Sequence, residues 1–139
     1  MKIVRNNCFG GFSLSPLAVM EYAKLKGIEL FIYKDINHYP CMDYVKVNSV
    51  EDVKDFLFVY YATKDLGERC SSKELNDNFF NDRGVERNDP CLVEVVEKLG
   101  EKANGRFAEL IVVEIPDGIE WDITEYDGLE KVEEVHRSW

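Results

Sequence analysis

Two adjacent glycines followed by a serine form the stretch of this sequence best suited to binding chemistry. Gly10 and Gly11 lie between a short apolar stretch and an amphipathic segment, with Phe12 and Ser13 directly after them. Successive N–H groups in a Gly-rich turn that leads into a helix offer donors, and the positive end of the helix dipole, to an anion. The alternative is a tight turn with positive φ at one or both glycines, flanked by Phe9 and Phe12 packed into the core. The residues CFGGFSLS match neither GxGxxG nor GxxxxGK[ST], so both interpretations stay open.

A second candidate anion site is the loop that precedes a predicted helix at residue 90. Arg83 and Arg87 lie in this loop, and forked guanidinium groups can hold a phosphate or a carboxylate. The alternative is that the two arginines form surface ion pairs with Asp82, Glu86 or Asp89.

A third candidate site is the C-terminus, EVHRSW. His136, Arg137 and Trp139 place a titratable ring, a fork of donors and a flat aromatic within four residues. Such a group could stack on a base and hold a phosphate, or anchor a neighbouring subunit, or form a frayed end. The predicted ligand-binding residues are therefore Gly10, Gly11, Phe12, Ser13, Arg87, His136, Arg137 and Trp139.

Catalytic and metal-binding patterns are weak in this sequence. The four cysteines, Cys8, Cys41, Cys70 and Cys91, never approach a CxxC spacing, and the chain has two histidines. We expect reduced thiols, no structural zinc and no cofactor. No local signature of a nucleophile surrounds any cysteine. With 27 acidic residues, paired carboxylates arise by chance, so we favour a non-enzymatic protein.

The charge distribution limits the partners. The formal net charge is −10, and residues 109–139 contain ten Asp and Glu against Lys131 and Arg137. Nucleic acids and anionic membranes require a basic face, so we expect neither as a partner. No apolar run approaches the roughly 20 residues that span a bilayer, and no signal peptide is evident, so we expect a cytoplasmic protein. A small anion in a pocket or a basic protein surface is compatible with this charge.

Periodicity and capping residues predict one α+β domain over residues 1–139, with two to three helices packed on a mixed or antiparallel sheet. Ser15 and Asp89 are predicted N-caps, each followed by a proline that suits the first helical position. The Asp127-Gly128 pair predicts a two-residue hairpin, and residues 129–136 fit either a strand or a short helix. Helices are expected over 16–26, 72–80 and 89–105, and strands over 1–5, 28–36, 44–49, 57–64 and 109–116.

Three stretches carry a resemblance to a known family. They are CFGGFSLS, ERNDPCLVEVVEKLGEKANG and EYDGLEKVEEVHRSW. The match that they belong to covers nearly the whole chain. The sequence resembles a family of small phage and prophage proteins with a GGFxLS turn, an RxDPxLVxxVxxLGxxANG helix and a YDGxE…HRSW ending. Residues 129–131 depart from that pattern where an aromatic is expected more often. The resemblance implies a shared fold and brings no catalytic residues with it.

The resemblance also implies a context, that of phage accessory proteins which act on the host cell. Together with the glycine turn, it suggests a homo-oligomeric, non-enzymatic protein that sequesters a small phosphorylated, nucleotide-derived ligand and so counters antiviral signalling. The alternative function is an acidic interaction protein that docks on a host protein and inhibits it. These two functions differ in partner class, and the sequence leaves both open.

Overall fold

The structure, a computed structural model, describes residues 1–37, 43–53 and 58–135, and in that part of the chain every strand pairing is antiparallel. The strands form three small sheets rather than the single sheet predicted. The first sheet pairs β1 (Lys2–Asn6) with β6 (Leu110–Glu114). The second has the order β4-β2-β3-β5, with strands β2 (Phe31–Asp35), β3 (Tyr44–Val47), β4 (Val59–Ala62) and β5 (Arg69–Cys70). The third is the hairpin of β7 (Trp121–Tyr126) and β8 (Leu129–Glu134).

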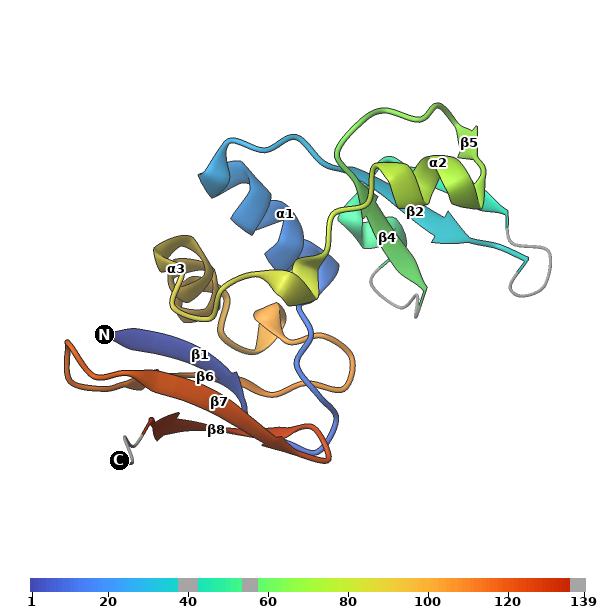
Figure 1. Cartoon of the computed structure of the whole chain (residues 1–139). Coiled ribbons are helices and arrows are strands. Elements are labelled where there is room, and N and C mark those ends of the chain that lie inside the picture. The colour runs from blue at the N-terminus through green and yellow to red at the C-terminus, as the bar shows by residue number, and fades with distance from the viewer. Residues whose placement is uncertain (38–42, 54–57, 136–139) are drawn as a thin grey trace.

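The fold class is α+β, as predicted, and the α-helices are α1 (Pro16–Lys26), α2 (Ser72–Asp77) and α3 (Pro90–Leu99). In Figure 1, α1 and α3 lie together above β1 and β6, whereas α2 and the four-stranded sheet form the other end of the molecule. Short 3₁₀ turns occur at η1 (Val50–Val53), η2 (Asp82–Gly84) and η3 (Gly100–Ala103).

The two long helices begin where their caps were predicted. The hydroxyl of Ser15 accepts a hydrogen bond from the Ala18 N–H at 3.1 Å, which satisfies one of the unpaired donors of the first turn of α1. Asp89 accepts from the Cys91 N–H at 2.8 Å at the start of α3. Gly27 ends α1 in the left-handed conformation with φ of 70°.

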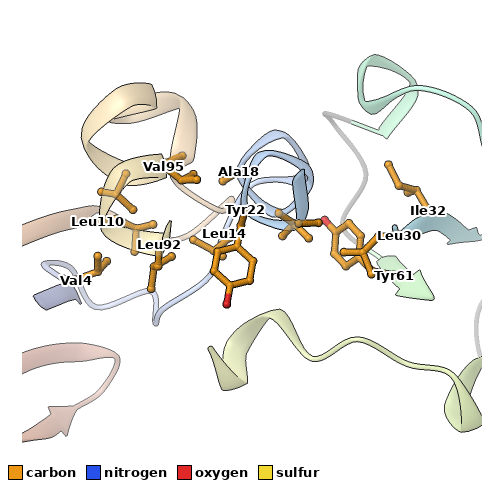
Figure 2. Packing of buried hydrophobic residues seen from close by; sticks show 14 of the residues in the cluster. Val4, Leu14, Ala18, Tyr22, Leu30, Ile32, Tyr61, Leu92, Val95 and Leu110 are labelled. Atoms are coloured by element: carbon orange, nitrogen blue, oxygen red, sulfur yellow. The ribbon is translucent and has the colours of Figure 1, made fainter. Parts of the chain in front are cut away.

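One hydrophobic core joins both ends of the molecule. Figure 2 shows its side chains in a continuous row, from Val4 and Leu110 on β1 and β6 to Ile32 on β2. Full burial of an aliphatic or aromatic side chain contributes about 1.5–3 kcal/mol, so this row fixes the four-stranded sheet relative to α1 and α3. The buried members from the helices are Ala18, Val19, Tyr22, Ala23, Leu92, Val93, Val95 and Val96.

Two helices end earlier than predicted, and each early end has a physical reason. Helix α2 ends at Asp77 rather than at residue 80, because Phe79 forms an antiparallel bridge with Ala62 of β4. Helix α3 ends at Leu99, because Gly100 adopts a φ of 57° and the chain tightens into η3. Residues 129–134 form a strand, one of the two alternatives left open by the sequence, since Asp127 and Gly128 have φ values of 50° and 90° and close the predicted hairpin.

Candidate functional site

The glycine turn is held by close backbone packing on both sides. Gly11 has a φ of 89°, as the turn interpretation predicts. A methyl group on Gly10 would overlap the carbonyl oxygen of Phe107, and one on Gly128 would lie 2.5 Å from the backbone nitrogen of Gly11. Gly10 therefore packs closely against residue 107, and the backbone of Gly11 lies close to Gly128 at the tip of the β7–β8 hairpin. The turn also ends before the helix begins, because α1 starts at Pro16.

The two phenylalanines beside the turn lie in different surroundings. The turn alternative placed both phenylalanines in the core, and for Phe9 this was wrong, because the residue is 63% exposed. Phe12 packs partly buried against the core, and its ring lies 3.5 Å from the guanidinium carbon of Arg87. Direct contact of Gly10, Gly11 and Phe12 with a ligand stays a prediction.

Arg87 forms a bidentate ion pair with Glu130, and both side chains are largely shielded from solvent. Its Nη1 lies 2.6 Å from Oε1 and its Nη2 lies 2.9 Å from Oε2. The two side chains are 16% and 6% exposed. The surface partners that the sequence suggested for Arg87 are wrong, since the carboxylate comes from β8 and not from the loop. A ligand that used Arg87 would have to replace this carboxylate.

Asn6 completes a polar cluster that fastens the β7–β8 hairpin to β1. Its N–H donates to Glu130 Oε1 at 2.8 Å, and its Nδ2 donates to the carbonyls of Cys8 at 2.8 Å and Gly128 at 2.7 Å. Arg5 Nη1 donates to the Glu130 carbonyl at 2.7 Å. We call Asn6, Arg87 and Glu130 the hairpin clasp. Its bonds explain why Asn6 and Glu130 are buried although both are polar.

A groove of about 910 Å³ lies along β4, and we call it the β4 groove. It is lined by residues 13–16, 58–61, 104–107 and part of 79–83. Three phenylalanines line it and remain 43%, 45% and 59% exposed, at Phe58, Phe79 and Phe107 respectively. Aromatic rings that stay exposed together in a concave surface mark a binding site more often than rings scattered singly.

Positive groups lie in the same groove. Arg83 and Arg106 both line it, and both are exposed. Within the described ranges no carboxylate forms an ion pair with Arg83. The guanidinium carbon of Arg106 lies 5.8 Å from the ring centroid of Phe107. Guanidinium groups beside aromatic rings can hold an anionic group attached to a flat ring.

Asp82 and Ser13 also line the β4 groove. Asp82 is half-buried there, and desolvation raises the pKa of its carboxyl, although its own backbone N–H and Arg83 act against this rise. Ser13 packs against Gly105, where an added methyl group would overlap the Ser13 hydroxyl. Ser13 is thus a predicted ligand residue that lies in this groove, whereas Arg87 belongs to the hairpin clasp.

The other predicted features are placed as follows. His136, Arg137 and Trp139 lie outside the described residues, as does Cys41. The thiols of Cys8, Cys70 and Cys91 are free. In the described part of the chain, no cluster of three His, Cys, Asp or Glu could hold a metal ion, and no helix is both long and apolar enough to cross a membrane.

Comparisons with known proteins add no further assignment. No family model, curated protein or solved structure matches this chain. The resemblance to phage and prophage proteins therefore stays a prediction.

Proposed function

We propose that this protein binds and sequesters a small phosphorylated, nucleotide-derived ligand in the β4 groove, without chemical turnover. The observation that carries the proposal is that three exposed phenylalanine rings and two arginines share one concave surface. A base can stack on the rings, which is worth about 1–3 kcal/mol per base. The guanidinium groups can form charge-assisted hydrogen bonds with phosphate oxygens.

The size and charge of the groove agree with such a ligand. Small-molecule sites commonly enclose about 300–1,000 Å³, and this groove falls within that range. The whole chain has a net charge of −10, which repels an anion at long range. The local positive charge of Arg83 and Arg106 therefore has to outweigh that repulsion at short range, and removal of either should weaken binding strongly.

Isothermal titration calorimetry against cyclic and ADP-ribose-type nucleotides tests the proposal. We expect sub-micromolar binding by at least one of them, and recovery of the intact nucleotide when the protein is heated. Recovery of a chemically changed nucleotide would indicate an enzyme instead. No binding by any nucleotide of the panel would remove the proposal.

Two pairs of variants place the ligand. Arg83→Ala should weaken binding at least tenfold, whereas Arg69→Ala should not, because Arg69 is exposed on β5 and pairs with Asp43 outside the groove. Phe107→Ala should weaken binding, whereas Phe9→Ala should not, because Phe9 is similarly exposed but does not line the groove. Equal losses in the two members of a pair would place the ligand elsewhere.

The context proposed for this activity is that of a phage accessory protein in the host cytoplasm that removes a nucleotide signal of antiviral defence. It is supported by the resemblance of the sequence and by the chemistry of the groove. Expression of the protein in a cell that carries a nucleotide-signalling defence should lower the free signal, and Arg83→Ala should restore it. An unchanged level of the free signal would contradict this context.

One observation favours the alternative, a protein that docks on a basic protein surface. On the hairpin, Asp122 lies directly opposite Glu133, and like charges in that position destabilise a strand pair. Tyr126, at the tip of the hairpin, is 77% exposed. A basic partner would relieve the repulsion. A pull-down from host lysate should then weaken with added salt and disappear when Glu133 and Glu134 are neutralised.

A further inference from the structure

A carboxyl group in the β4 groove has few partners within the protein. Asp82 is half-buried, yet among the residues described here no cation forms an ion pair with it and no side chain donates to it. Asp89 is a useful contrast. Its carboxylate accepts from the Tyr22 hydroxyl at 2.8 Å, from the Cys91 N–H and from the Lys26 ammonium. A shielded carboxylate that lacks such partners costs stability, which points to a role with a ligand.

The groove also contains an open main-chain edge, because β4 is the outer strand of its sheet. Along an antiparallel strand, main-chain groups of alternate residues point to opposite sides. The Phe58 carbonyl accepts from Asp35 N–H on the β2 side, whereas the Tyr61 carbonyl accepts from Phe80 N–H on the outer side. Val59 therefore directs its N–H and C=O outward, like Tyr61. In the described part of the chain, neither group of Val59 has a hydrogen-bond partner.

We propose that the base recognised in this groove is guanine, an inference that depends on the proposed function. The Asp82 carboxylate accepts hydrogen bonds from the N1–H and the N2 amino group, and the Val59 N–H donates to O6. The base lies against the phenylalanine rings, and Arg83 and Arg106 hold the phosphate.

The donor pattern of the bases explains this choice. Guanine places two donors, N1–H and N2–H, side by side, and a carboxylate can accept both at once. Adenine and cytosine place an amino donor beside a ring nitrogen acceptor, whose lone pair the carboxylate repels. Uracil has a single N–H between two carbonyl oxygens. Guanine is therefore the common base that satisfies both oxygens of Asp82.

Competition among GMP, AMP and IMP tests the inference on the unaltered protein. Each hydrogen bond to a charged group is worth about 10- to 100-fold in affinity, so GMP should bind at least about tenfold more tightly than AMP. IMP lacks the N2 amino group and should bind about tenfold more weakly than GMP. Equal affinity for GMP and IMP, or tighter binding of AMP, would overturn the guanine assignment.

An exchange of specificity provides the second measurement. Asp82→Asn replaces one acceptor by a donor, so the variant should lose affinity for GMP and gain affinity for XMP, whose C2 carbonyl can accept from the new amide. Asp77→Asn is the matched control, because Asp77 is exposed at the end of α2 and does not line the groove. An unchanged GMP to XMP ratio in Asp82→Asn would also overturn the assignment. Should that variant fail to fold, the IMP comparison decides alone.

The failures of the two proposals can be told apart. If AMP binds as tightly as GMP and Arg83→Ala abolishes both, the groove binds nucleotides but Asp82 does not select guanine. If no nucleotide binds, both the proposed function and the guanine assignment fail.

Discussion

Removal of the charge from Glu130 should destabilise the protein more than any comparable change to a surface ion pair. Glu130→Gln keeps the size of the side chain and an oxygen for the Asn6 N–H, but it leaves the Arg87 fork with one acceptor and an opposing amide donor. The variant therefore isolates the charge of the hairpin clasp from its shape.

The expected magnitude follows from burial. Loss of one partner of a buried ion pair typically costs about 3–5 kcal/mol. Arg87 keeps 16% of its side chain exposed, so water compensates part of the loss and we expect about 3 kcal/mol. In a domain of this size, 1 kcal/mol lowers the Tm by about 3–4 °C, so the Tm of Glu130→Gln should fall by about 10 °C.

Urea unfolding of a double-mutant cycle measures this effect. Arg87→Met, Glu130→Gln and the double variant should give a coupling energy of about 2 kcal/mol, because the two groups act as one unit. The matched control is the pair of Lys2 and Glu97, at 3.1 Å, in which both side chains are 46% exposed. Its coupling energy should be below about 0.5 kcal/mol. Similar coupling energies in the two pairs would show that burial does not give the clasp its strength.

Three further predictions follow from the turn, the first helix and the groove. Gly10→Ala should destabilise the protein by about 1–3 kcal/mol in urea unfolding, since the added methyl group overlaps the Phe107 carbonyl; an unchanged midpoint would show that the contact is loose. Ser15→Ala should lower the free energy of unfolding by about 1 kcal/mol, because the Ala18 N–H loses its acceptor. A decrease below about 0.3 kcal/mol would show that Ser15 does not stabilise the start of α1. Asp82→Asn should raise the urea midpoint at pH 7, because burial raises the pKa of this carboxyl and its ionisation therefore destabilises the folded state. That gain should shrink as the pH falls through the raised pKa and vanish below about 3.9, the ordinary aspartate value, where Asp82 is neutral in both states; a gain that persists at pH 3 would contradict the assignment.

Local signals in the sequence were sufficient to predict most elements. The caps at Ser15 and Asp89 and the Asp127-Gly128 turn depend on residues within four positions of one another, so their chemistry can be read from spacing. Boundaries were less certain where a distant segment intervened. Helix α2 stops early because Phe79 pairs with Ala62, a contact that no local pattern encodes.

The hairpin clasp and the β4 groove were harder to predict for the same reason. Glu130 is one of 27 acidic residues, and its partner Arg87 is 43 residues away in the sequence. The groove gathers Phe58, Phe79 and Phe107 from three separate segments of the chain, and each ring alone is typical of a core residue. Arg83 was a candidate anion ligand from its position in the loop, but its neighbours in space were not evident.

The most direct test of the central claim, that the β4 groove binds a nucleotide, is a titration of isotope-labelled protein with GMP followed by ¹H–¹⁵N NMR. If the groove binds GMP, the largest shift changes should occur at its backbone amides, including those of Ser13, Val59, Phe79 and Arg106. Amides of the hairpin clasp and of the outer face of β7 and β8 should change little. Shift changes concentrated on the hairpin, or none at saturating GMP, would show that the β4 groove does not bind this nucleotide.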